Sequence, residues 1–260
     1  MTDKIEKEEV QPETSESAEE KPKAKARRRV RCPDCTGHGE PTERNADIVL
    51  CAECGVVFRN PRPSAGEVLA RRDTRFAGSL TRNHAAAIRE ESRTAVEAMR
   101  GYHRMTSGKD APLNGFGKRV LDVGCGLGFR LREFEKYGWT VTGVEPSANA
   151  AAYTQAVALH AVRADLDAPL PGPFDFVLLE GVLEEVPEPA KVIAAVKDAL
   201  APRGVVYVAV AASDGETSID EGRLYAFGEE GLRRLLMAAG FAEPEVRKED
   251  DALRMWLRRK

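Results

Sequence analysis

The stretch from Val120 to Ser147, VLDVGCGLGFRLREFEKYGWTVTGVEPS, constrains the fold more than any other part of the chain. It reads as an apolar strand, a turn with three alternating glycines, a helix, and a second strand that ends on an acid. Strands joined through a helix run parallel and are buried on both faces. The stretch therefore predicts an α/β domain with a ligand edge at the carboxyl ends of these strands.

The same alternation of apolar runs and helical stretches continues to the last residue. Further strands are expected at 161–165, 174–180, 204–211, 241–248 and 252–259, and further helices at 149–158, 189–200 and 228–240. With the first two strands, this pattern predicts a Rossmann-like, doubly wound, mostly parallel sheet of seven strands over residues 118–260.

The glycine turn does not fit the two common nucleotide motifs. A dinucleotide turn needs Gly-x-Gly-x-x-Gly, and Phe129 stands where its last glycine would fall. The turn also lacks a Walker lysine, so a nucleoside triphosphate is not indicated. Glu145, at the end of the second strand, can accept two hydrogen bonds from a ribose diol. The pattern favours a nucleoside with an uncrowded ribose and no pyrophosphate.

Four cysteines precede this domain as two pairs, CPDC and CAEC. The pairs are Cys32 with Cys35 and Cys51 with Cys54, separated by 15 residues, which suits a four-thiolate zinc site. Two disulfides are the alternative, but the chain shows no secretory signal and is expected in the reducing cytoplasm. We predict a zinc ribbon over residues 30–62 with structural Zn²⁺. Because its core is small, it should unfold without the metal.

The remaining segments are charged or helical. Residues 1–29 are expected to be a disordered tail, and the basic run Lys21–Arg31 reads as a solvated linker or as a nucleic-acid contact. The net charge of −3 indicates no general attraction to nucleic acid. Residues 63–117 read as two helices with a break near 77–79, followed by a linker, and are expected to form a lid or docking segment. No apolar run is long enough for a membrane span.

Two motifs together resemble a known family. VLDVGCGLG followed by VTGVEPS is similar to the class I S-adenosylmethionine-dependent methyltransferases, and FDFVLLEGVLEEVPEPAKVIAAVKDALAPRGVVYVAV resembles the same family's fourth and fifth strand region. The resemblance covers residues 118–260 and implies S-adenosylmethionine as the cofactor. The implied cofactor-binding residues are Asp122, Gly124, Gly126, Gly128, Glu145, Pro146, Asp165, Leu166 and Glu180.

The resemblance also implies a part for each of these residues. The three glycines and Glu180 would line the methionine end, and Asp122 would hold its amino group. Glu145 would bind the ribose hydroxyls, with Pro146 and Ser147 beside the sugar or the adenine. Asp165 and Leu166 would contact the adenine.

Candidate catalytic groups follow the fourth strand and lie in the helical segment. Many relatives place a Glu-His pair after this strand, where the chain has Glu184 and Glu185. Glu185 is therefore a candidate general base, and His103 is the second candidate. His84 and Tyr102 are further acid–base candidates in the helical segment.

The leading hypothesis is an S-adenosylmethionine-dependent methyltransferase that acts on a small molecule or sugar derivative by direct in-line transfer. The whole layout, a zinc ribbon ending in NPRPS before this domain, resembles bacterial methyltransferases of sugar, polysaccharide and other small-molecule pathways. Two alternatives stay open. One is an RNA methyltransferase that binds RNA through the zinc ribbon and the basic run. The other is a non-catalytic scaffold that retains the fold. The sequence indicates no oligomeric state.

Overall fold

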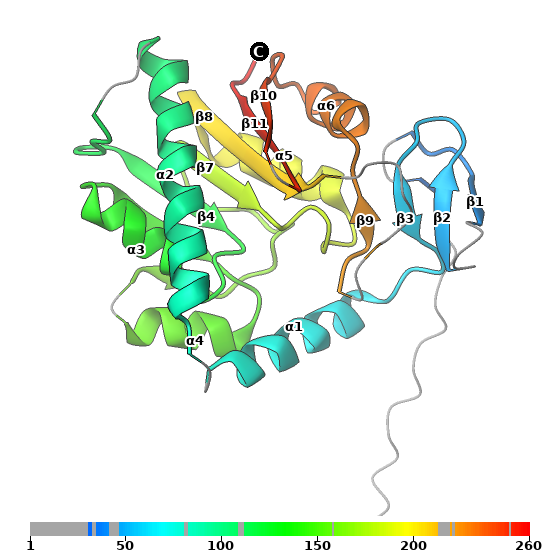
Figure 1. The fold of residues 1–260 in the computed structure, drawn as a ribbon, viewed down its shortest axis with the longest axis horizontal. Helices are drawn as coiled ribbons and strands as arrows, with labels where there is room; N and C mark the ends of the chain where they lie inside the picture. The colour runs from blue at the N-terminus through cyan, green and yellow to red at the C-terminus, as the bar shows by residue number, and fades with distance from the viewer. Residues whose placement is uncertain are drawn as a thin grey trace, which may run out of the picture.

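The computed structural model describes residues 31–32, 35–41, 47–80, 83–108, 112–157, 159–212, 219, 222–249 and 251–260. The predicted disordered tail, 1–29, and the basic run except for Arg31 lie outside these ranges. In Figure 1 the described chain forms a large α/β body with a small sheet at one side.

A seven-stranded sheet forms the centre of the large body, as the sequence predicts. Its order is β10-β11-β8-β7-β4-β5-β6. The strands are β4 (Arg119–Val123), β5 (Thr140–Val144), β6 (Ala161–Val162), β7 (Phe174–Glu180), β8 (Leu200–Ala211), β10 (Glu245–Glu249) and β11 (Ala252–Leu257). Only the pairings of β11, with β8 and with β10, are antiparallel in this sheet of described residues. The chain order reverses between β4 and β7, so the carboxyl ends of β4 and β5 border the crevice where such sheets bind ligands.

Helices cover both faces of the sheet (Figure 1). They are α1 (Ala65–Ser79), α2 (Ala85–Ser107), α3 (Phe129–Lys136), α4 (Ala148–Ala156), α5 (Pro189–Ala199) and α6 (Glu229–Ala238). Phe176 of β7 packs in one core cluster with side chains of α2 and α3, whereas its neighbour Val177 packs in the other with side chains of α5 and α6. Each central strand is therefore apolar on both faces, which is why the strands read as continuous apolar runs.

The small sheet contains three strands of the cysteine-bearing segment and one strand from the large body. The strands are β1 (Gly39–Pro41), β2 (Ile48–Cys51), β3 (Val57–Arg59) and β9 (Tyr225–Ala226), in that order. The sequence stretches DIVL and VVFRN, on either side of the second cysteine pair, are typical of short strands and correspond to β2 and β3, whereas no sequence pattern indicated β1 or β9. Phe58 pairs with Tyr225, and both are fully buried in the core cluster that continues into the large body. The ribbon is therefore built into the main domain.

Helix α1 lies along the carboxyl edge of the sheet (Figure 1). It begins with a capping box in which the Ser64 hydroxyl accepts a hydrogen bond from the Glu67 amide, and Glu67 accepts one from the Ser64 amide. The helix ends at Ser79 and α2 begins at Ala85, so the break between the two predicted helices lies just after the predicted position, 77–79. Asp73 fixes its position, because it accepts a hydrogen bond from the Ser147 hydroxyl at 2.5 Å. Among the described helices, none is both long enough and apolar enough to cross a membrane.

Candidate active site and metal centre

The glycine turn between β4 and α3 forms the floor of the crevice. Gly124, Gly126 and Gly128 all have positive φ, at 77°, 55° and 77°. A Cβ at Gly128 would lie 2.7 Å from the Thr154 Cγ2 atom, and one at Gly126 would lie 3.3 Å from the Phe76 ring. The turn therefore needs glycine both for its backbone conformation and for its close contacts with α4 and α1.

Glu145 lies beside this turn, fully buried at the end of β5. Its Oε2 accepts a hydrogen bond from the Gly126 amide and its Oε1 accepts one from the Ser147 amide, both at 2.9 Å. The Arg72 guanidinium of α1 also donates to both oxygens, at 3.0 Å from Nε and 3.3 Å from Nη2. The sequence places Glu145 at the ribose position, but it does not reveal the arginine that covers it.

A second arginine lies at the methionine side of the turn. Arg130 is almost fully buried, with Nη1 3.3 Å from the Asp122 Oδ2 atom and Nε 3.3 Å from the Glu180 Oε2 atom. Burial raises the pKa of Asp122 to about 7, and Arg130 opposes that shift. Asp122 and Glu180 thus both contact the same buried cation, Arg130.

Three cavities surround Arg72, which lines all of them. One of about 440 Å³ is lined by Pro146, Asp165 and Leu166, the predicted sugar and adenine residues. One of about 260 Å³ is lined by Gly124, Gly126 and Glu180, from the predicted methionine end. The third, of about 370 Å³, is lined by Val68, Arg71, Arg72, Arg75, Glu185 and Gly222. Arg72 therefore stands between the two predicted halves of a cofactor cleft.

The two predicted catalytic residues have different surroundings. Glu185 lines two of the cavities and accepts hydrogen bonds from Arg75 at 2.7 and 2.9 Å and from Arg72 at 3.4 Å. His103 lines none of the three cavities and packs edge-on against Tyr102, whose ring contacts Phe176 near the start of β7.

The position of His103 follows from the length of α2. The helix rises about 1.5 Å per residue, so His103 lies roughly 18 Å along the axis from Glu91, which does line the methionine-side cavity. We therefore correct the expectation that His103 faces the cleft. Tyr102 lies at the same end of α2. His84 is the candidate in this segment that lines one of the three cavities, with its ring 5.2 Å from that of Phe129.

Sequence reasoning missed the arginines at the site. Arg72 and Arg75 belong to the run LARRDTRF on α1, and Arg130 lies on the first turn of α3. The sequence signal that could have indicated them is the spacing of Arg72 and Arg75, which places both side chains on one face of a helix, one turn apart. Only the docking of α1 on the sheet edge shows that one of them is buried.

The four cysteines converge from two turns of the same construction. The Cys32 amide donates to the Gly37 carbonyl and the Cys51 amide to the Val56 carbonyl, both at 2.9 Å. The residue after each pair, Thr36 or Gly55, has positive φ, at 60° and 74°. Each turn thus bends sharply enough to bring both of its sulfur atoms to one side.

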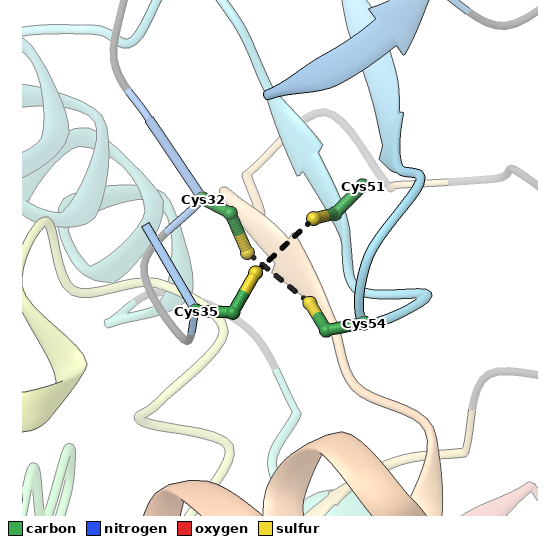
Figure 2. Close-up of side chains that lie close together, drawn as sticks. All are labelled: Cys32, Cys35, Cys51 and Cys54. Atoms are coloured by element: carbon green, nitrogen blue, oxygen red, sulfur yellow. Dashed lines mark hydrogen bonds between the residues drawn. The ribbon is translucent and has the colours of Figure 1, made fainter. Parts of the chain in front are cut away.

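The four cysteine side chains point toward a common centre, as Figure 2 shows. Cys32 Sγ lies 3.3 Å from Cys54 Sγ, Cys35 Sγ lies 3.4 Å from Cys51 Sγ, and all four atoms lie within 4.8 Å of one another. These separations exceed a disulfide bond length of about 2.05 Å. They approach the edge of about 3.8 Å that Zn–S distances near 2.3 Å give a tetrahedron. The donor set and its geometry fit one tetrahedral Zn²⁺.

Comparison with known proteins identifies the family. The methyltransferase-domain family matches residues 92–247, more than half of the chain. The chain belongs to this family, and its large body has the Rossmann-like methyltransferase fold.

Curated relatives match a shorter part. The chain is 35% identical over 120 residues to a ubiquinone biosynthesis O-methyltransferase of Psychrobacter cryohalolentis, which covers 41% of this chain and 46% of that protein. It is 39% identical over 106 residues to the protein of the same name from Thiobacillus denitrificans, which covers 37% of this chain and 45% of that protein. The chain thus spans less than half the length of these relatives.

Solved structures match over more of the chain. The 1,6-didemethyltoxoflavin-N1-methyltransferase of Burkholderia thailandensis, solved with 1,6-didemethyltoxoflavin and S-adenosylhomocysteine, has a TM-score of 0.60 and 22% identity, covering 85% of this chain and 99% of that one. The magnesium protoporphyrin IX methyltransferase of Synechocystis, solved with S-adenosylhomocysteine, has a TM-score of 0.53 and 19% identity, covering 74% and 94%. At these identities the similarity concerns the fold.

Proposed function

We propose that this chain is an S-adenosylmethionine-dependent methyltransferase that acts on a small-molecule acceptor. The observation that carries the proposal is the crevice at β4 and β5, where Glu145 and the glycine turn lie between two cavities lined by the expected adenine-side and methionine-side residues. The curated relatives, named as O-methyltransferases of ubiquinone biosynthesis, support an acceptor of small size.

The cavities suggest how the chain holds its cofactor. Leu166 is buried and offers an apolar surface to the adenine, while the exposed carboxylate of Asp165 can accept a hydrogen bond from its amino group. Glu145 accepts the ribose hydroxyls, and Asp122 and Glu180 attract the positively charged amino group of the methionine. In this assignment Pro146, Asp165 and Leu166 line the adenine-side cavity, and Gly124, Gly126 and Glu180 line the methionine-side cavity. Glu145 is buried beneath Arg72, which lines both cavities.

S-adenosylmethionine supplies, when bound, a methyl group already activated on a sulfonium. The protein then has to align the acceptor and exclude water. The cavity lined by Arg75 and Glu185 opens next to Arg72, and we assign it to the acceptor. Both Glu185 oxygens already accept hydrogen bonds from arginines, so we give Glu185 a positioning part.

We propose further that the four cysteines hold structural Zn²⁺. Four thiolates leave no coordination position open for substrate, so the metal supports the fold. In this division of the chain, residues 30–62 carry the metal ribbon and residues 63–117 supply the helices that cover the cleft.

Calorimetric titration of the zinc-loaded protein with S-adenosylhomocysteine tests the proposal. We expect one-to-one binding with a dissociation constant in the micromolar range, which corresponds to a binding free energy of about −8 kcal/mol. Absence of binding heat at several temperatures, in protein shown to be folded, would contradict the proposal and favour the scaffold alternative.

A further inference from the structure

We infer that Arg72 and Arg75 bind an anionic group, a carboxylate or a phosphate, on the methyl acceptor, and that the carboxylate of Glu185 holds this position until the acceptor arrives. The inference rests on the proposed function, because it takes the ribose of the cofactor as the group that claims Glu145.

Three groups among the described residues donate hydrogen bonds to Glu145. Two of them, the amides of Gly126 and Ser147, belong to the backbone of the glycine turn and of the β5–α4 connection, and they stay in place. The third, Arg72, comes from a separate helix. A ribose diol would donate to the same two carboxylate oxygens. Arg72 is therefore the partner that has to leave when the ribose binds.

Arg72 keeps its positive charge after it leaves Glu145. Its side chain is 7% exposed, and its other ion pair is a 3.4 Å contact from Nη1 to Glu185. A buried guanidinium that loses its bidentate partner is costly unless another anion replaces it. Glu185 serves Arg75 through both of its oxygens, so it cannot also provide a full bidentate partner for Arg72.

A cavity lies beside Arg72 and Arg75. The cavity of about 370 Å³ is bordered by Arg71, Arg72 and Arg75, with Glu185 as the carboxylate among its lining residues. A volume of this order suits a small ligand. The Arg75–Glu185 pair already shows the two-pronged geometry in which a guanidinium recognises an oxyanion. An acceptor carrying its own oxyanion would complete the pairing of Arg72.

The resulting coupling can be measured without knowing the acceptor. If cofactor binding frees Arg72 for an anion, then the anion must in turn tighten cofactor binding by the same factor. S-adenosylhomocysteine would be titrated into the full zinc-loaded chain in chloride, in acetate and in inorganic phosphate, at equal pH and ionic strength. We expect acetate or phosphate to tighten binding at least about fivefold relative to chloride. The more effective anion identifies the acceptor group as a carboxylate or a phosphate.

Three variants make the test specific. Arg75→Gln should still bind S-adenosylhomocysteine but lose the anion effect. Glu185→Gln removes the internal anion and should enlarge the effect. Arg93→Gln is the matched control, because Arg93 is an exposed arginine paired with Glu90 on α2, and the change in net charge is the same. Far-UV circular dichroism verifies that each variant is folded.

Two results would overturn the inference while leaving the proposed function intact. One is equal affinity for S-adenosylhomocysteine in all three solutions. The other is an anion effect that persists in Arg75→Gln. Failure of folded protein to bind S-adenosylhomocysteine in any solution would instead overturn the proposed function, and this inference with it.

Discussion

At the scale of single residues, Glu145 links the backbone of the glycine turn to helix α1 and to the expected ribose. Glu145→Ala removes the hydrogen bonds to the ribose, so we expect S-adenosylhomocysteine binding to weaken by about 1–3 kcal/mol in calorimetry. Glu135→Ala is the control, because Glu135 is exposed on α3 and pairs with Arg132. Unchanged affinity in a folded Glu145→Ala protein would mean that the ribose is held elsewhere.

Glu184 provides a prediction about pH. Burial raises the pKa of Glu184 to about 7, although its Oε1 accepts a hydrogen bond from the Ala211 amide at 2.9 Å. The folded protein therefore holds this proton more tightly than the unfolded chain. The resulting stabilisation is complete below about pH 4.5, is lost as the pH rises toward about 7, and changes no further above it.

Glu184→Gln retains an acceptor for Ala211 and removes the buried charge. We expect the variant to be more stable than the wild type by about 2 kcal/mol at alkaline pH, with a smaller difference at acidic pH. Urea unfolding across this pH range measures the difference. Glu188→Gln serves as the exposed control from the same loop. An equal difference at every pH would show that folding leaves the pKa of Glu184 unchanged.

At the scale of elements, two glycines with positive φ distinguish the cost of a left-handed backbone from the cost of a crowded side chain. Gly117 has φ of 73° and would have no atom within 4 Å of an added Cβ, whereas Gly128 has φ of 77° and its Cβ would meet Thr154. We expect Gly117→Ala to lower the free energy of unfolding by about 1 kcal/mol, the cost of left-handed backbone alone. Gly128→Ala should cost about 3 kcal/mol because the helices must also shift. Equal losses in urea unfolding would contradict this reading.

The elements also show what the sequence could predict. The strand Phe174–Glu180 was predicted with its observed ends, because runs of apolar residues between turn signals mark buried parallel strands. β9 has two residues, too few for any periodicity, and exists only because β3 lies beside it. The docking of α1, which buries Arg72, likewise depends on partners distant in sequence, such as Glu145. The sequence therefore predicted that a ligand binds at the carboxyl ends of the strands, but it did not predict that arginines of α1 lie there.

At the scale of the whole molecule, the four-cysteine ribbon connects to the loop that carries Glu185. The Tyr225 hydroxyl donates to the Pro187 carbonyl at 2.9 Å, and the Leu224 amide donates to the Glu184 carbonyl at 2.6 Å. Tyr225 is in turn paired with Phe58 of the ribbon. Loss of the ribbon's structure should therefore loosen one wall of the expected acceptor cavity.

Removal of the metal tests this connection. After chelation we expect amide protection to fall in β2, β3 and β9 by at least about tenfold, because the ribbon has little core of its own. The loss should extend to residues 184–187, while β10 and β11 keep their protection. Hydrogen exchange read by mass spectrometry measures each segment, and added Zn²⁺ should restore the pattern. Full protection of β2 and β3 in chelated protein would refute a structural role for the metal.

The pairing of β3 with β9 also determines when the small sheet can be completed during synthesis. Arg59 donates from its amide to the Leu224 carbonyl and from Nε to the Arg223 carbonyl, 164 positions later. The cysteine turns leave the ribosome early, but the edge of β3 stays open until β9 has been made. A nascent chain shorter than this therefore presents Val57 and Phe58, both buried in the finished fold, as an uncovered strand edge that a chaperone or a second chain can reach.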